Sequence, residues 1–283
     1  MAFDPATIPE SLKVAYREKR CAMMVGAGAS VGAGLPTWVG LLEEMIAVAE
    51  REVLLTPEKS AQYRTLLQRP EKFLMVAAGL KQEIGNIFDE VIERIFITSG
   101  PKPAPFHAAL AALDKLPFVL TINYDTLIEQ AFRDLNKTFP VLTFLDAGEI
   151  QRRLSRREFF LLKAHGDASR MGNGIVLTES DYRDILYKHR GYQSMLSAMF
   201  TMNTMVFVGA SMGDPELNLL LGYIADVFSP TSGPTHYALM AREDFTDVEK
   251  DRWRRDYKVQ IISISKANGY SDLTVFLTAL KDV

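Results

Sequence analysis

The chain has 283 residues, of which 48% are hydrophobic and 24% charged, and this composition excludes a disordered, collagen-like or coiled-coil protein. Its net charge of −3 argues against a dedicated nucleic-acid-binding domain, because such domains are usually basic. The single cysteine, Cys21, excludes an internal disulfide framework and a zinc or iron–sulfur site built from several cysteines, so we expect no metal.

The predicted elements alternate between short apolar runs and amphipathic stretches, which is typical of a parallel sheet covered by helices. No fixed repeat period is present, which argues against a solenoid or propeller. The predicted strands are Cys21–Val25, Phe118–Ile122, Val141–Phe144, Phe159–Lys163, Met205–Val208, Thr235–Met240 and Val259–Ser263. The predicted helices are Ser11–Arg20, Thr37–Val53, Pro57–Leu67, much of Lys72–Phe96, Phe106–Leu113, Thr178–Tyr187, Tyr192–Asn203, Glu216–Phe228, Asp244–Asp256 and Asp272–Leu280.

The block at about 57–98 contains no convincing strand, so we expect it to form a helical insertion on the sheet. No low-complexity linker divides the chain. The pattern therefore predicts one domain over residues 1–283, with a Rossmann-like α/β sheet and this insertion.

No membrane-spanning or secretory segment is evident. No apolar stretch approaches the roughly 18–20 residues that cross a bilayer. The first residues, from Met1 to Pro5, lack the basic-then-apolar order of a signal peptide. We therefore expect a cytoplasmic protein that does not associate with membranes.

A glycine-rich segment from Gly26 to Pro36 lies between the first strand and a helix. Glycines let backbone N–H groups approach a phosphate, and a helix N-terminus favours negative charge. The spacing of Gly26, Gly28 and Gly32 is one residue longer than the usual dinucleotide fingerprint, and the Lys-Ser/Thr of a P-loop is absent. A tight strand-to-helix connection without a ligand is the structural alternative.

Polar turns follow three more predicted strands, at 121–125, 163–167 and 209–217. The carboxyl ends of parallel strands meet at one edge of the sheet, so these turns and the glycine-rich segment are expected to line one crevice. Each has a structural alternative: helix capping by Asn123 or Asp125, a hydrogen-bonded core position for His165, and a turn at Ser211.

Together these segments resemble the sirtuin family. Gly26 to Ser30 with Ala33 to Pro36 matches the family's Gly-Ala-Gly-x-Ser and Ala-Gly-x-Pro, and Thr121 to Asp125 matches Thr-x-Asn-x-Asp. His165-Gly166 matches the family's His-Gly, and Gly209 to Ser211 matches its later Gly-x-Ser turn. The resemblance implies a Rossmann-type domain that binds NAD⁺.

The resemblance also implies roles for individual residues. Catalysis is expected from Asn123 at the nicotinamide ribose and from His165 as the base. The pyrophosphate, carboxamide and ribose contacts are expected from Gly26, Ala27, Gly28, Ser30, Asp125, Gly166, Gly209 and Ser211.

Two departures from protein-deacylating sirtuins narrow the expected activity. After Pro36 the chain continues Thr37-Trp38-Val39 where deacylases have Asp-Phe-Arg, and it lacks the four cysteines of their zinc module. Three runs, Asn123 to Glu129, Pro36 to Trp38 and Asp214 to Leu217, instead resemble the divergent bacterial branch of the family. Members of that branch hydrolyse NAD⁺ in antiphage systems such as Thoeris, so the resemblance implies NAD⁺ depletion rather than deacylation. A deacylase or ADP-ribosyltransferase, and a non-catalytic module that senses NAD⁺ or ADP-ribose, are the alternatives.

The expected reaction needs few groups, because nicotinamide leaves a cationic ring as a neutral molecule and requires no general acid. Asn123 would orient a water or ribose hydroxyl, and His165 would accept its proton. A histidine suits this step because its unperturbed pKa of about 6.5 lies near working pH. NAD⁺ is thus expected as substrate rather than as a regenerated cofactor.

The remaining candidates have structural interpretations. His107 lies on a predicted helix and is expected to be structural, and the arginine runs 152–157 and 252–255 are expected on solvated helix faces. The methionines between Met195 and Met212 are expected to pack a core or a subunit interface. The resemblance implies a homo-oligomer and a separate regulatory or sensor protein, since NAD⁺ loss needs control.

Overall fold

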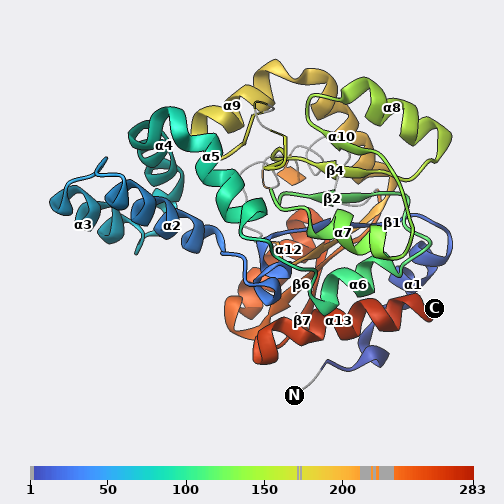
Figure 1. Ribbon diagram of the computed structural model, residues 1–283. Helices are drawn as coiled ribbons and strands as arrows, with labels where there is room; N and C mark the ends of the chain where they lie inside the picture. Colours follow the sequence, from blue (N-terminus) through green and yellow to red (C-terminus); the bar gives the residue numbers. More distant parts are fainter. Residues whose placement is uncertain (1–2, 171, 173, 211–217, 219–220, 223–232) are drawn as a thin grey trace.

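The computed structural model describes residues 3–170, 172, 174–210, 218, 221–222 and 233–283. Its strands form one seven-stranded sheet in the order β3-β4-β2-β1-β5-β6-β7, with every neighbouring pair parallel (Figure 1). This confirms the predicted parallel α/β sheet. The strands are β1 Cys21–Val25, β2 Val119–Thr121, β3 Val141–Thr143, β4 Leu161–Lys163, β5 Thr204–Val208, β6 His236–Ala241 and β7 Val259–Ile264.

The central strands are buried throughout because helices cover both faces of the sheet, and most of their residues are apolar. In β1, Cys21, Met23 and Val25 pack into one core cluster, whereas Ala22 and Met24 pack into the cluster on the opposite face. This alternation follows from the period of two in an extended strand. Helices α1, α6, α7 and α13 contribute to the first cluster, and α8, α9 and α10 to the second.

The helices have the following bounds: α1 Glu10–Arg17, α2 Trp38–Arg51, α3 Pro57–Leu66, α4 Phe73–Ile84, α5 Phe88–Glu93, α6 Pro105–Ala111, α7 Leu127–Asp134, α8 Ala147–Arg156, α9 Glu179–Lys188, α10 Arg190–Met202, α12 Asp247–Tyr257 and α13 Ala267–Lys281. Among the residues described, no helix has both the length and the apolar content needed to cross a bilayer.

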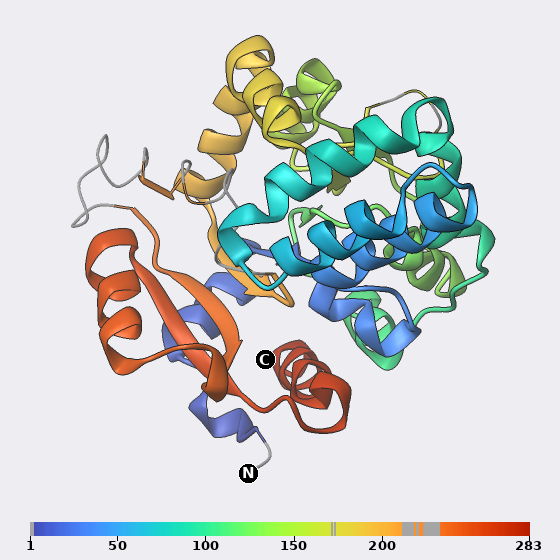
Figure 2. The same cartoon turned by 90° about the vertical axis from the view of Figure 1, so that its left-hand side faces the viewer.

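Residues 57–98, which we call the helical arm, contain α3, α4, α5 and a π-helical turn at Arg94–Thr98. The arm packs beside α2 and projects from the sheet (Figures 1 and 2). Its apolar side chains form a third core cluster, which also includes Tyr124 and Leu127 from the edge of the sheet. The arm therefore contacts the segment in which site residues were predicted.

Some predicted helices differ from those observed. The helix expected across 72–96 is interrupted at Gly85, whose φ of +60° ends α4. Helices α7 and α8 agree with the helices expected after Asp125 and at the arginine run 152–157, for which no bounds were predicted. Helix α13 begins five residues before Asp272. The helix predicted at 216–228 lies almost wholly outside the described residues. In α8, Arg152 and Arg153 form ion pairs with Glu149 at the surface.

The order of the strands locates the site. Within the sheet, β2, β3 and β4 lie on one side of β1, and the chain then crosses to β5, β6 and β7 on the other side of β1. The turns that follow β1 and β5 therefore diverge at a topological switch point, where ligands bind in open α/β sheets. The glycine-rich segment follows β1, and Gly209 follows β5.

Candidate active site

The turns after β1 and β5 interlock through glycine. Gly26 N–H donates to Val208 O at 3.0 Å, and Gly28 N–H donates to Gly209 O at 2.9 Å. A Cβ at Gly26 would lie 2.5 Å from Ala210 Cα, so no larger residue fits without a backbone shift. Gly209 itself has a φ of +63°. The packing of two loops thus accounts for these glycines even before any ligand is considered.

Most backbone donors of the glycine-rich turn are used within the protein. The N–H groups of Gly26, Gly28, Ala29 and Ser30 all donate to backbone oxygens. Ala27 N–H has no partner among the described residues. Of the N–H groups from 26 to 30, that of Ala27 is therefore the one left to contact a phosphate.

The hydroxyl of Ser30 is the centre of a buried hydrogen-bond network. Ser30 Oγ donates to Asp125 Oδ2 at 3.0 Å and accepts from Asn123 Nδ2 at 3.1 Å. His107 Nε2 lies 3.5 Å from the same oxygen. These four side chains are at most 7% exposed. A hydroxyl has one proton and two lone pairs, so these neighbours use its full capacity.

His107 joins this network, although the sequence suggested only a structural role. Its Nδ1 accepts the Ala104 N–H at 3.1 Å, and burial lowers the pKa of the ring while the Asp125 carboxylate opposes that shift. The neutral ring therefore has its proton on Nε2, facing Ser30 Oγ. No motif spacing connects His107 with Ser30, which lies 77 residues earlier, so the sequence held no signal for this contact.

The side chain of Asn123 has a fixed orientation. Its Nδ2 donates to Gly26 O at 3.2 Å and to Ser30 Oγ, so both amide protons are used. A flipped amide would place Oδ1 against the Gly26 carbonyl, which cannot donate. Asn123 Oδ1 is buried and has no hydrogen-bond partner among the described residues. The amide thus keeps one buried acceptor without a partner among these residues.

Asp125 is bound on both oxygens. Oδ2 accepts from Ser30, and Oδ1 accepts the Leu127 N–H at 2.9 Å at the beginning of α7. The N-cap of α7 is Thr126 rather than Asp125, but the Asp125 carboxylate accepts the first N–H of the helix, where an acidic group is stabilising. Its predicted contact with the nicotinamide carboxamide stays a prediction.

His165 follows strand β4 as Asn123 follows the neighbouring strand β2. Strands β2 and β4 are neighbours in which Thr121 pairs with Lys163, so Asn123 and His165 each follow the paired residues by two positions. The His165 ring is 3% exposed and packs edge-on against Tyr182 of α9, with centroids 5.3 Å apart. The turn after β4 therefore brings the two predicted catalytic residues to the same edge of the sheet.

Gly166 is required by the turn that follows His165. Its φ is +94°, and a Cβ there would lie 2.3 Å from Gly174 O. Space for a ribose is therefore not needed to explain this glycine. Ser211, predicted on the ribose side, lies outside the described residues.

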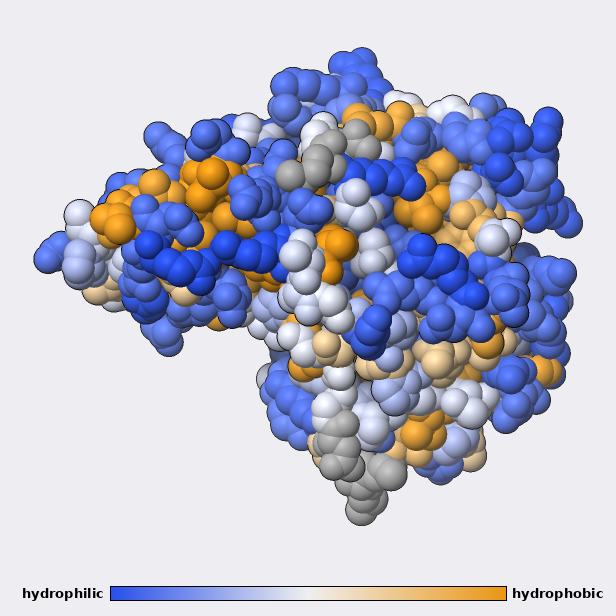
Figure 3. All heavy atoms as spheres, in the orientation of Figure 1, coloured by the Kyte–Doolittle hydropathy of each residue, from blue (hydrophilic) through white to orange (hydrophobic). Residues whose placement is uncertain are grey.

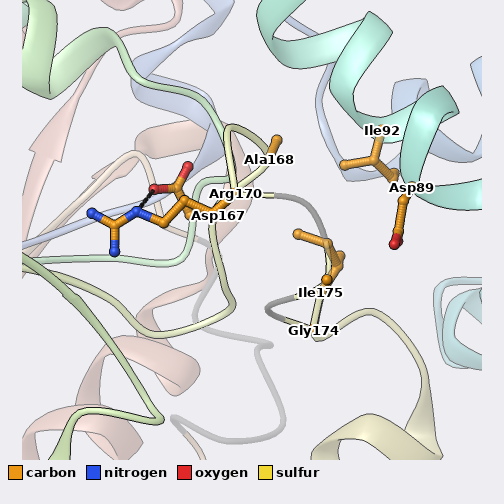
Figure 4. A pocket seen from close by; sticks show the side chains of 8 residues that line it. Asp89, Ile92, Asp167, Ala168, Arg170, Gly174 and Ile175 are labelled. Carbon is orange, nitrogen blue, oxygen red and sulfur yellow. Dashed lines mark ion pairs between the residues drawn. The ribbon is translucent and has the colours of Figure 1, made fainter.

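Figure 4 shows a small pocket between α5 and the segment that follows β4, in which Asp167, Gly174 and Ile175 lie. Asp167, Ala168, Arg170 and Asp89 line it, and Arg170 pairs with Asp167 at 3.3 Å. None of the predicted site residues lines this pocket. Within the described part of the chain, no three His, Cys, Asp or Glu side chains are grouped to hold a metal ion.

Three comparisons relate the chain to known proteins. The SIR2-like domain family matches residues 117–262, just over half of the 283 residues. The NAD(+) hydrolase ThsA of Bacillus cereus (strain MSX-D12) is 28% identical over 269 residues, covering 94% of this chain and 52% of that protein. Defense-associated sirtuin 2 of Bacillus subtilis is 28% identical over 212 residues, covering 74% of this chain and 19% of that protein.

A solved structure, described as the crystal structure of a Sir2 homolog–NAD complex, aligns with a TM-score of 0.47 at 14% identity and covers 97% of this chain and 94% of that chain. The chain spans about half the length of the NAD(+) hydrolase and a fifth of the defence-associated sirtuin. The motif resemblance and the extent of the family match agree. The protein is a member of the SIR2-like domain family.

Proposed function

We propose that the protein is an NAD⁺ hydrolase that cleaves the bond between nicotinamide and ribose, giving nicotinamide and ADP-ribose, as an effector of bacterial antiphage defence. Relatives named NAD(+) hydrolase ThsA and Defense-associated sirtuin 2 support this assignment. Several ThsA proteins from different bacteria are similar over most of this chain, at 25–28% identity.

The observation that carries the proposal is the acceptor of Asn123. Both of its amide protons are used, and the buried Oδ1 has no partner among the described residues. A buried acceptor of this kind is costly unless a bound molecule supplies a donor. A water or a ribose hydroxyl can donate to it and is then held in one orientation, which favours attack.

His165 would act as the base. As the water oxygen bonds to the ribose C1′, the bond from C1′ to the nicotinamide nitrogen breaks and its electron pair neutralises the ring. The proton of the water passes to His165 and later to solvent. Asn123 and His165 follow the ends of neighbouring, in-register strands, and this supports the two roles.

The phosphates would lie over the switch point between β1 and β5. Ala27 N–H, which has no partner among the described residues, would donate to the pyrophosphate. Gly26, Gly28 and Gly209 would shape the turn, and Ser30 would support Asn123 through its hydroxyl. Asp125 would hold the nicotinamide amide or its ribose, Gly166 would leave room for the ribose, and Ser211 would lie on the ribose side.

The test is incubation of the purified protein with NAD⁺, followed by chromatographic separation of the products. Nicotinamide and ADP-ribose formed without any peptide support hydrolysis. Consumption that requires an acylated peptide identifies a deacylase, and binding without products identifies a sensing module. Intact NAD⁺ under every activating condition would refute the proposal.

An enzyme that removes NAD⁺ from its own cytoplasm requires restraint, so we also propose a regulatory protein partner and self-association. Figure 3 shows apolar surface gathered over the helical arm, where Met75 is 49% exposed. Met202 at the end of α10 is 73% exposed, whereas Met199 of the same helix is buried in the core. Such surface favours association. Light scattering with and without NAD⁺ tests the oligomer.

A further inference from the structure

Lys163 places a positive charge inside the sheet domain. It is the last residue of β4, and its side chain is fully buried. The alternation of β4 puts it on the same face as Leu161, whose neighbours form an apolar core with α7. A buried strand whose alternate residues face an apolar core is expected to have an apolar residue at 163. The ammonium of Lys163 therefore needs a specific explanation.

The Lys163 ammonium binds the turn that contains Asn123. Its Nζ donates to Asp125 O at 2.6 Å and to Tyr124 O at 3.2 Å. These carbonyls belong to the two residues that follow Asn123. Tyr124 is itself fixed, since its hydroxyl donates to Val176 O at 2.7 Å.

The same ammonium binds the turn that contains His165. Nζ lies 3.0 Å from Asp167 Oδ1, two residues beyond His165. Ala168 N–H donates to Tyr124 O at 3.0 Å, so the two turns also touch directly. One buried cation therefore connects both turns that hold the proposed catalytic groups.

The charges around Lys163 are balanced. Glu129 of α7 lies 3.2 Å from Nζ, and Asp167 also pairs with Arg170. Burial raises the pKa of Glu129, against the effect of Lys163. Burial also acts to raise the pKa of Asp167, but Lys163 and Ser169 hold it below its usual value. Well-packed apolar side chains can replace such buried ion pairs without loss of stability, so stability alone does not explain the charge.

We propose that Lys163 is a positioning residue, which holds the turn after β2 and the turn after β4 at the separation that aligns Asn123 with His165. This inference rests on the proposed function. A misplacement of about 1 Å can cost on the order of 100-fold in rate, so the loss of this link should lower turnover more than binding.

The test uses Lys163→Met together with Glu129→Gln, which removes the ammonium without stranding the Glu129 charge. We expect a folded protein whose KM for NAD⁺ changes little and whose kcat falls by about 100-fold. Glu129→Gln alone keeps both carbonyl contacts of Lys163 and should lose far less turnover. Where the double variant does not fold, Lys163→Gln with Glu129→Gln keeps an uncharged NH₂ donor group at position 163, and an intermediate kcat is expected.

Lys137→Met is the matched control. Its Nζ also donates to a backbone carbonyl, Ala111 O at 2.7 Å, and lies over the ring of Phe132, away from both turns. It should keep the turnover of the parent protein. If the Lys163 double variant folds and keeps its kcat, or if Glu129→Gln alone is equally damaging, the positioning role is refuted.

Hydrogen exchange supplies a readout that needs no NAD⁺. The N–H groups of Ala168 and Val176 bond to the carbonyls of Tyr124 and His165, and they should exchange faster in the Lys163 double variant but not in Lys137→Met. If the parent protein does not cleave NAD⁺ while exchange accelerates as expected, the proposed function fails alone. Unchanged exchange refutes the link through Lys163.

Discussion

The sheet domain and the helical arm stabilise their interiors differently. The buried polar side chains described in the structure lie almost entirely outside the arm, where Ser60 is the single example. The arm relies on an apolar core with ion pairs at its surface, such as Arg64 with Glu50 and Lys59 with Glu83. The edge of the sheet instead buries Ser30, Asn123 and His107 in one network.

The difference agrees with the proposed site at the edge of the sheet. Buried polar groups must be satisfied or they destabilise the fold, so a concentrated network specifies one arrangement of side chains. Exposed ion pairs contribute little to stability and fix little geometry. Substitutions should therefore affect turnover at the edge of the sheet and have small effects in the arm.

The largest expected effect is on turnover in His165→Gln. The variant removes the proposed base but keeps a polar side chain of similar size, so kcat should fall by about 10²–10⁴-fold with little change in the midpoint of thermal unfolding. Steady-state release of nicotinamide measures this. Turnover close to that of the parent protein would show that another group accepts the proton.

A pH-dependent loss of stability is expected from His236 at the beginning of β6. Burial lowers its pKa to about 4, and its Nδ1 accepts the Met205 N–H at 3.1 Å, so the ring is neutral in the folded protein. Between pH 6.5 and about 4 the unfolded chain binds a proton that the folded chain does not, so stability falls as pH falls through this range.

Once the pH is below both pKa values, the difference in His236 protonation has lowered the free energy of unfolding by about 3 kcal/mol. Urea unfolding at several pH values measures the total slope, and the ring signals of His236 in NMR isolate its share. A ring that titrates at the same pH in the folded and the unfolded protein would contradict the assignment.

Ser30→Ala in the buried network and Thr56→Ala at the beginning of α3 together compare the two regions. Ser30→Ala leaves Asp125 Oδ2 and Asn123 Nδ2 without their bonds to the hydroxyl and should cost about 1–3 kcal/mol of stability as well as most turnover. Thr56→Ala removes the N-cap of α3 in the arm and should cost about 1 kcal/mol. Its turnover should be unaffected. Equal losses of turnover in the two variants would remove the distinction between the regions.

The smallest effect is expected from Arg64→Met in the arm. The guanidinium contacts Glu50 through two hydrogen bonds and Glu43 through a third, but the side chains of Arg64 and Glu50 are still 41% and 36% exposed. We expect the midpoint of urea unfolding to stay within experimental error. A clear decrease would show that surface ion pairs hold the arm together, and the contrast between the two regions would weaken.

The sequence identified the strands well because each is a short apolar run whose signal is local. All seven lie within two residues of their predicted ends. Helix ends were less certain, since α13 begins early and Gly85 divides the helix expected across 72–96. The arginine run 152–157 was predicted on a solvated helix face because of its charge. The helix that contains it, α8, also packs Ile150 into the core.

The sequence by itself determined the α/β class, the family motifs and the residues expected to contact NAD⁺. These depend on neighbouring residues, through the period of two in strands and the backbone freedom of glycine. The tertiary structure decided which side chains bond to the Ser30 hydroxyl, His107 among them, and it left Asn123 Oδ1 buried without a partner among the described residues. It also decided that Lys163 connects the turns after β2 and β4. These contacts join residues far apart in the chain, and they depend on the order β4-β2-β1, which no local pattern encodes.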